Sequence, residues 1–179
     1  MLPRDFYRIC RIAASLGKTT EVTVIGSTAA IPWLELQEAE ADFWPSVEVD
    51  ISVEPDPDVV ELVGEYSAFH SQYGVYAQPA TPLTQFIAPA DWRDQAGCFP
   101  FLGEDDQKID LWVPTPEDLF CAKLARGEPR DWDFVGAHAQ ILGVSVDEVL
   151  GRLGAAVGAH PSYEPNLRKA MRLAPHKFV

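Results

Sequence analysis

Basic residues are missing from a long stretch of this 179-residue chain. Between Thr19 and Trp92 there is no lysine or arginine, while the same stretch holds thirteen aspartate and glutamate residues. The whole chain carries a net charge of −13 at pH 7. Because phosphate binding needs local positive potential, this charge argues against a general polyanion binder. Basic side chains gather near the two ends of the sequence, at Arg4, Arg8, Arg11, Arg168, Lys169, Arg172 and Lys177.

Cysteine is scarce, and long apolar runs are absent. Cys10, Cys98 and Cys121 lie far apart and form no CxxC pair, which argues against a disulfide framework and against a zinc site. No apolar run reaches the roughly 18 residues that a membrane helix needs. The first residues also lack the apolar stretch and cleavage site of a signal peptide. We therefore expect a reduced, cytoplasmic protein that has no membrane partner.

The order of the predicted elements indicates the fold class. Apolar residues make up 47% of the chain, which suffices for a core. Strands and helices alternate first, and helices dominate later, which predicts an α+β fold. We expect residues 1–113 to form an α/β core with an N-terminal helix, and residues 114–179 to form a helical portion packed on it. The predicted helices are 2–17, 28–40, one from Pro55, 115–126, 130–142, one from Ser145 and 165–173, and the predicted strands are 21–25, 48–53, 73–77, 85–88 and 108–113.

The basic residues at the start are regularly spaced. Arg4, Arg8 and Arg11 recur after four and three residues, so they share one face of the first predicted helix. A solvated surface is one interpretation of this face. A binding surface for RNA or for an acidic partner is another, and the sequence leaves both open.

A short motif at the end of the first predicted helix resembles a phosphate-binding loop. Gly17-Lys18-Thr19 has the last residues of that loop, but Ile12 stands where its first glycine is required. We interpret the run as a helix end followed by a turn.

A buried strand ends at a glycine–serine corner. Residues 22–25 are apolar or β-branched, Gly26 and Ser27 break the run, and Pro32 delays or kinks the helix that follows. Such a corner offers backbone N–H groups and the Ser27 hydroxyl to a phosphate, and Gly26 lets the ligand come close. An ordinary strand-to-helix turn can have the same residues, so the corner indicates a phosphate site only in combination with the next strand.

That next strand carries two acids on one face. Glu48 and Asp50 alternate with valine and isoleucine, so their side chains point to the same side. Two carboxylates this close repel each other unless cations lie between them, and Mg²⁺ prefers oxygen ligands and substrate phosphates. We expect Glu48 and Asp50 to bind Mg²⁺ or Mn²⁺, with Asp110 on a later strand as a candidate third ligand. The alternative is a half-exposed strand whose acids face water.

A lysine stands on the apolar stripe of the helix predicted over residues 115–126. Lys123 follows Phe120 by three residues, and a lysine in this position usually extends to water. It could instead point at a triphosphate. Asp131, at the start of the next helix, could orient Lys123, act as a base, or complement the helix dipole.

Two sets of motifs resemble a known superfamily. Val24-Ile25-Gly26-Ser27 followed by Ser46-x-Glu48-x-Asp50 is similar to motifs of the polymerase-beta-like nucleotidyltransferases. A later set resembles the small bacterial nucleotidyltransferase-like proteins related to AbiEii-type toxins, and the similarity covers roughly residues 20–155. The later set comprises Asp91-Trp92-Arg93, Pro116-Glu117-Asp118-Leu119, Lys123-Leu124, Gly127 and Arg130-Asp131-x-Asp133-Phe134-Val135.

The resemblance implies a nucleotidyltransferase-type mixed β-sheet and a Mg²⁺-dependent reaction. A nucleotide would move from an NTP to an RNA or protein acceptor. In the toxin branch the acceptor is often the 3′ end of a tRNA, and a cognate antitoxin restrains the enzyme. These properties are expectations carried by the resemblance alone.

The resemblance also implies roles for individual residues. Gly26 and Ser27 would hold phosphate, and Glu48 and Asp50 would hold metal. In the later set, Lys123 would contact the triphosphate and Asp131 would assist it. The implied catalytic residues are Asp50, Lys123 and Asp131.

The sequence departs from the superfamily pattern in two places. Relatives often have Arg-x-Thr-x-Asp-x-Asp at the second strand, where this chain has Trp44, Ser46, Glu48 and Asp50. Glu128 stands where an arginine is common, and we expect Arg126 to bind the nucleotide in its place. These changes keep two alternatives open. One is a catalytically degenerate domain that binds a nucleotide or a partner protein, and the other is a small α/β interaction module.

Overall fold

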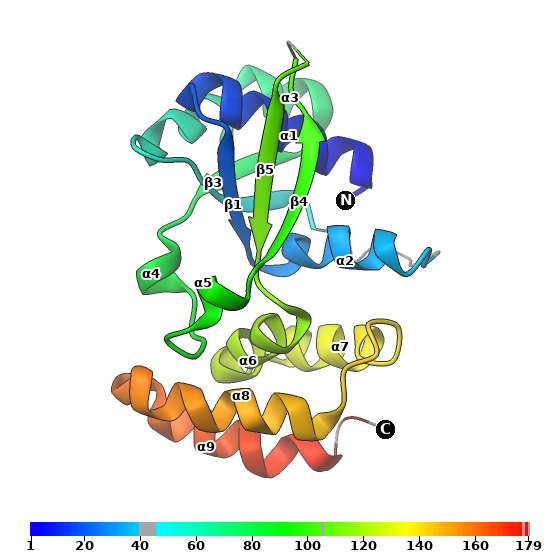
Figure 1. Cartoon of the computed structure of the whole chain (residues 1–179), viewed down its shortest axis with the longest axis vertical. Coiled ribbons are helices and arrows are strands. Elements are labelled where there is room, and N and C mark those ends of the chain that lie inside the picture. The colour runs from blue at the N-terminus through cyan, green and yellow to red at the C-terminus, as the bar shows by residue number, and fades with distance from the viewer. Residues whose placement is uncertain (40–45, 105, 177, 179) are drawn as a thin grey trace. The chain divides into compact units, whose positions relative to one another are not determined.

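The structure is a computed structural model that describes residues 1–39, 46–104, 106–176 and 178 (Figure 1). Two compact units divide the chain between them. The sheet unit contains Met1–Ile31, Asp42–Gln85 and Gly97–Val113, and the helical unit contains Pro32–Ala41, Phe86–Ala96 and Pro114–Val179. The last segment of the helical unit begins at Pro114. Two earlier segments, around residues 32–39 and 86–96, also belong to the helical unit.

Five strands form one mixed sheet in the order β3-β2-β1-β5-β4. β1 runs antiparallel to β2 and parallel to β5, while β3 is parallel to β2 and β4 is antiparallel to β5. Figure 1 shows β1, β5 and β4 side by side. The strands are β1 Glu21–Ile25, β2 Glu48–Ser52, β3 Tyr76–Pro79, β4 Gly97–Leu102 and β5 Lys108–Val113. This mixed sheet with flanking helices confirms the predicted α+β class.

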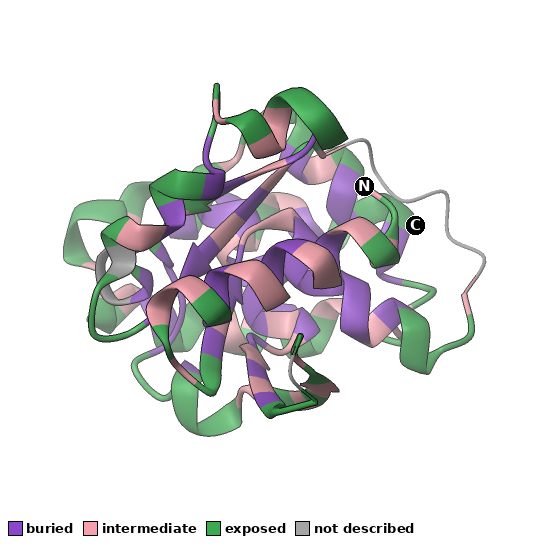
Figure 2. Cartoon of the chain, turned by 90° about the horizontal axis from the view of Figure 1, so that it is seen from above, coloured by how far each residue is buried: buried purple, intermediate pink, exposed green. Residues whose placement is uncertain are grey.

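Alternation of apolar and polar residues explains why the sheet has two different faces. Val22, Val49 and Leu111 are fully buried on one face, next to helix α1 (Pro3–Gly17). Asp50 and Trp112 lie on the other face and are partly exposed. Because side chains alternate along a strand, the acids of β2 stay on the face opposite α1. Figure 2 shows buried residues running along the strands, while many of the turns between elements are exposed.

Several predicted elements of the first half differ from the observed ones. The helix expected over residues 28–40 is a 3₁₀ turn, η1 (Ser27–Ala30), followed by a short helix, α2 (Ile31–Leu36). Pro32 occupies the first turn of α2, where a missing N–H is tolerated. Residues 40–45, Trp44 among them, lie outside the described residues. The helix expected from Pro55 is a 3₁₀ helix, η2 (Pro57–Val63).

The two short strands predicted around the Pro-Thr-Pro turn were largely wrong. Residue 73 ends helix α3 (Ala68–Tyr73), and β3 begins at Tyr76. Residues 85–88 form no strand, because α4 (Pro82–Gln85) ends there and a buried irregular segment follows. Strand β4 was not predicted.

In the helical unit the starts of the predicted helices are confirmed, but the helix predicted over residues 130–142 ends at His138, and a turn follows it up to Gly143. The short helix over residues 92–95 was not predicted. The Thr115 side chain accepts a hydrogen bond from the Asp118 N–H at 3.2 Å, and Ser145 and Glu148 form the expected capping box. Among the described residues, no helix is long and apolar enough to cross a membrane. The helices are α5 Trp92–Gln95, α6 Pro116–Arg126, α7 Pro129–His138, α8 Val146–Ala159, η3 Pro161–Tyr163, α9 Glu164–Leu173 and η4 Ala174–His176.

Replacing a leucine at the centre of the sheet will destabilise the protein. Leu111 is fully buried, so Leu111→Ala removes apolar contacts and leaves a cavity that costs about 2–5 kcal/mol. Leu102 is 57% exposed at the edge of the same sheet, so Leu102→Ala should change stability by less than about 0.5 kcal/mol. Urea unfolding followed by circular dichroism measures both. Equal effects of the two substitutions would contradict the assigned burial.

Candidate functional site

The glycine–serine corner and the acid of β2 meet at the end of β1. Ile25 is paired with Asp50 in the antiparallel ladder, and Gly26 follows with φ 76° and ψ −168°. A Cβ atom at position 26 would collide with the Asp50 carboxylate oxygen Oδ2. Glycine is therefore required at this position for two reasons, which are the positive φ and the close approach of the carboxylate. The structure brings Gly26, Ser27 and Asp50 together.

Glu48 lies two residues before Asp50 on the same face of β2. Its carboxylate oxygen Oε2 accepts a hydrogen bond from the Tyr76 hydroxyl at 3.1 Å, and Tyr76 is its neighbour in register on β3. Burial raises the pKa of Tyr76 to about 12, and the hydrogen bond to Glu48 and the charges of Glu48, Glu65 and Asp50 act in the same direction. The carboxylates of Glu48, Glu65 and Asp50 thus lie close enough to the Tyr76 hydroxyl to disfavour its ionisation.

The corner contains a polar group that sequence reasoning overlooked. The Thr28 side chain is 4% exposed, and within the described part of the chain its hydroxyl has no hydrogen-bond partner. Buried hydroxyls are nearly always hydrogen-bonded, so an exception next to Ser27 requires an explanation. A bound phosphate is one group that could accept this hydrogen bond.

Asp110 does not join the other acids. It is in register with Glu21 at the start of β1, whereas Asp50 is in register with Ile25 at the end of β1. Four residues of strand separate these levels by about 13 Å. Lys108 forms an ion pair with Asp110 at 2.8 Å. The register thus leaves two carboxylates, Glu48 and Asp50, near the corner.

Two carboxylates near the corner are oxygen ligands of the class that Mg²⁺ takes from proteins. In the described ranges, no group of three or more His, Cys, Asp or Glu side chains is arranged to hold a metal ion. Mg²⁺ commonly takes one or two carboxylates from the protein and completes its shell with water and substrate phosphates. Glu48 and Asp50 supply hard oxygen ligands of this kind.

Lys123, Arg126 and Asp131 come together in the helical unit. Arg126 on α6 donates to both carboxylate oxygens of Asp131 on α7, with Nε to Oδ2 at 2.7 Å and Nη2 to Oδ1. The Lys123 Nζ lies 3.6 Å from Asp131 Oδ1 and 5.0 Å from the centre of the Phe134 ring. The Lys123 side chain is 7% exposed, so this lysine does not extend to water as surface lysines do.

Asp131 serves as the shared anion of these two cations. Burial by itself raises the pKa of Asp131, but the hydrogen bonds and charge of Arg126 and the charge of Lys123 outweigh it and hold the pKa below its usual range. Asp131 Oδ2 also accepts the Glu128 N–H at 3.2 Å, in the capping box of α7. A carboxylate with a lowered pKa and engaged oxygens is a poor base, so the geometry fits orientation of Lys123 better than proton transfer.

Arg152 is a second residue that sequence reasoning missed. Its Nε and Nη2 donate to the two carboxylate oxygens of Asp118 at 2.7 and 2.8 Å, and Nη2 also donates to Asp91 at 3.1 Å. Burial raises the pKa of the fully buried Asp118, although Arg152 opposes the shift. Through Arg152, Asp118 therefore binds α6 to α8, and Asp91 binds segment 86–96 to α8.

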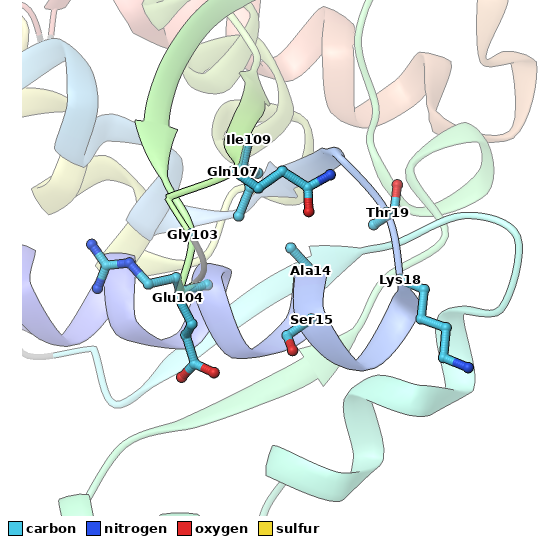
Figure 3. A pocket seen from close by; sticks show the side chains of 9 residues that line it. Ala14, Ser15, Lys18, Thr19, Gly103, Glu104, Gln107 and Ile109 are labelled. Atoms are coloured by element: carbon cyan, nitrogen blue, oxygen red, sulfur yellow. The ribbon is translucent and has the colours of Figure 1, made fainter.

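The Gly17-Lys18-Thr19 motif has no features of a phosphate loop. Lys18 follows α1 in a left-handed conformation with φ 50°, where the negative end of the helix dipole lies. A hollow of about 250 Å³ is present there, between the end of α1 and the β4–β5 turn. Figure 3 shows the Lys18 ammonium pointing away from the other side chains that line it. The hollow contains none of the predicted site residues.

Replacing Asp131 should destabilise the helical unit in a pH-dependent way. Asp131→Asn removes the buried carboxylate that faces Lys123 and Arg126, which costs about 3 kcal/mol at pH 7. Because the folded pKa of Asp131 is lowered, its contribution is complete above the ordinary value of about 3.9 and is lost as the pH falls through the folded value. Urea unfolding at several pH values measures the difference between wild type and variant.

The neighbouring acid on α7 provides a matched control for that experiment. Asp133 is exposed, so Asp133→Asn should change stability by less than about 0.5 kcal/mol at any of these pH values. A pH-independent loss in Asp131→Asn would contradict the assigned ion pairs.

The Thr28 hydroxyl can be tested by an isosteric substitution. Because Thr28→Val removes a buried polar group that lacks a partner, we expect no loss of stability and a gain of up to about 1–3 kcal/mol. Urea unfolding checks this, and a loss above 1 kcal/mol would show that the hydroxyl has a partner in the folded protein.

Comparison with known protein families gave a match over most of the sequence. The family described as nucleotidyltransferase of unknown function (DUF6036) matches residues 5–166. Comparison with curated proteins and with solved structures gave no match. The matched range includes the corner at Gly26, the acids of β2 and the cluster around Asp131. The chain therefore belongs to the family of nucleotidyltransferases of unknown function (DUF6036).

Proposed function

We propose that this protein transfers a nucleoside monophosphate from an NTP to an acceptor in a Mg²⁺-dependent reaction. The observation that carries the proposal is the packing of the Asp50 carboxylate against the Gly26 backbone, directly before Ser27. Membership of a nucleotidyltransferase family supports the reaction class. The acceptor is an RNA, such as a tRNA, or a protein, as the resemblance to toxin-like relatives implies.

Each residue near the corner has a distinct role in this proposal. Gly26 admits the phosphate chain close to the backbone, and the hydroxyls of Ser27 and Thr28 donate hydrogen bonds to phosphate oxygens. Asp50 and Glu48 would hold Mg²⁺, and Tyr76 orients the Glu48 carboxylate by its hydrogen bond. Bound Mg²⁺ supplies Lewis-acid stabilisation of the charge on the phosphates. We propose that either Mg²⁺ or Mn²⁺ serves as the metal cofactor.

Labelling with radioactive NTPs tests the proposed reaction. The protein is incubated with each of the four NTPs, Mg²⁺ or Mn²⁺, and total tRNA or the protein alone as acceptor. We expect labelled RNA or labelled protein, and a loss of at least about 100-fold in rate for Asp50→Asn, since a metal-binding carboxylate stabilises the transition state by several kcal/mol. Absence of product with every NTP and acceptor would contradict the proposal.

Asp110→Asn is the matched control for the labelling experiment. It removes one carboxylate from the same face of the same sheet, at the level of Glu21 and away from the corner. We expect its labelling rate to remain within about threefold of wild type, a difference below about 1 kcal/mol. Equal losses in Asp50→Asn and Asp110→Asn would refute the two-carboxylate site.

The hydrogen bond between Tyr76 and Glu48 favours a second candidate function. It already occupies one oxygen of the residue that stands where relatives have an aspartate. In this candidate the domain binds an NTP, or a partner protein, without turnover. An NTP-induced rise in melting temperature with no labelled product would support it, because a ligand that binds the native state stabilises that state.

The residues of the helical unit and the toxin role remain separate proposals. If Lys123 and Arg126 bind the triphosphate, Lys123→Met and Arg126→Gln should raise KM for the NTP more than they lower kcat.

If the protein is the toxin of a toxin–antitoxin pair, its expression should arrest bacterial growth, and Asp50→Asn should abolish that arrest.

A further inference from the structure

A groove lined by arginine and aromatic side chains runs between α1 and the edge strand β4. Its volume is about 500 Å³, and all of the residues that line it belong to the sheet unit. These residues are Arg4, Tyr7, Arg8, Arg11, Pro100 and Phe101. The three arginines are those that the sequence places on one helix face, and none of the lining residues contributes to the corner at Gly26.

The rings and guanidinium groups of this groove contact one another. The centres of the Tyr7 and Phe101 rings lie 5.5 Å apart, and the Arg11 guanidinium lies 5.9 Å from the centre of the Phe101 ring. The Arg8 guanidinium lies 4.5 Å from the centre of the Tyr73 ring, at the end of α3. Such stacking holds a flexible arginine in an extended position and leaves less side-chain entropy to lose on binding.

Positive charge predominates in the groove. Asp5 forms ion pairs with Arg8 at 2.9 Å and with Arg4 at 3.7 Å, and three arginines outnumber this one carboxylate. Arg11 Nε donates to the Leu102 carbonyl at 2.7 Å, which fixes the side chain beside β4. This local excess of positive charge contrasts with the net charge of −13 of the whole chain.

A second hollow lies towards the other end of α1. Arg11 also lines the hollow of about 250 Å³ that Ser15 and Lys18 border (Figure 3). Arg4, Arg8 and Arg11 recur at helical spacing, and the helix rises about 10 Å from Arg4 to Arg11. The ammonium of Lys18 points away from the other side chains of the hollow (Figure 3). Glu104 and Gln107 border the far hollow, so the strongest positive charge lies at the Arg4–Arg11 end of α1.

We propose that this groove binds a single-stranded nucleic acid. Arginine side chains bind phosphates, and aromatic rings stack on bases, which is the combination found in proteins that bind single strands. An acidic peptide would bind through the arginines and would need no ring face for stacking. The groove lies beside α1, whereas Asp50 lies on the sheet face opposite α1, so binding here does not depend on the proposed transfer reaction.

Fluorescence anisotropy with a short fluorescein-labelled oligouridylate tests the proposal. The full chain is titrated without NTP and with EDTA, between about 50 and 200 mM salt. We expect Arg4→Gln/Arg8→Gln/Arg11→Gln to weaken binding at least about tenfold and to flatten the slope of log K against log salt by about 2, since each phosphate contact to a single strand contributes about 0.7.

The aromatic part of the groove is tested by a separate substitution. If a base stacks on Tyr7, Tyr7→Leu should weaken oligouridylate binding about 5- to 150-fold with little change of the salt slope. Polyglutamate serves as the competitor that carries charge but no bases, and we expect it to displace the oligonucleotide far less well than unlabelled oligouridylate.

The basic helix α9 supplies the matched control. Arg168→Gln/Lys169→Gln/Arg172→Gln removes the same charge from exposed positions of the helical unit and should leave affinity and slope nearly unchanged. Circular dichroism verifies that each variant is folded. If the triple α1 variant does not fold, Arg4→Gln, whose side chain is 75% exposed, should still flatten the slope by about 0.7.

Three results would overturn the proposal. They are unchanged binding in the α1 variants, an equal loss in the α9 variant, and displacement by polyglutamate combined with no effect of Tyr7→Leu. The last result would indicate an acidic protein partner. Because no NTP or divalent cation is present, failure of the transfer reaction leaves the outcome of this experiment unaffected.

Discussion

The contact between the Asp50 carboxylate and the backbone of Gly26 is the constraint on which the interpretation of this protein depends. It exists because β1 and β2 are antiparallel with Ile25 opposite Asp50, and because a residue without a Cβ follows Ile25. A carboxylate against a glycine–serine corner combines a hard anionic ligand with hydroxyl and N–H donors. The rest of the sheet unit holds these two elements in register.

A fully buried carboxylate organises part of the helical unit. Asp131 accepts from Arg126, lies near Lys123 and caps the first turn of α7, so one anion links two helices. Arg152 joins α8 to Asp118 and Asp91 in a similar way. Bidentate arginine–carboxylate pairs are directional, and they fix helices more specifically than apolar contacts do. Part of the motif that resembles small nucleotidyltransferases therefore has a structural explanation.

Features that depend on local sequence were predicted better than features that depend on contacts between distant residues. The bounds of β1 and β5, the caps of α6 and α8 and the shared face of Glu48 and Asp50 all follow from short-range spacing. Strand β4 was missed because Gly97 and Pro100 disfavour a strand in a central position, whereas an edge tolerates them. Residues 85–88 were mistaken for a strand, since the short buried apolar run over 86–88 has no distinguishing period.

In the candidate site, too, contacts between residues far apart in the sequence could not be predicted. Spacing shows that Asp110 faces outward from its strand, but only the register with Glu21 shows at which end of β1 it lies. Arg152 lies 34 residues after Asp118 and cannot be paired with it from the sequence. The Thr28 hydroxyl is similarly inconspicuous until burial and hydrogen bonding are known.

The strand order has a consequence for how copies of this protein can meet. β3 and β4 are the two outer strands, and each contains a proline, Pro79 and Pro100. A proline cannot donate a backbone hydrogen bond, so both margins of the sheet resist extension by a strand from another molecule. Amyloid-like growth and strand-swapped assembly are thereby disfavoured. A partner molecule must therefore bind this sheet unit through its side chains and not by backbone pairing with an edge strand.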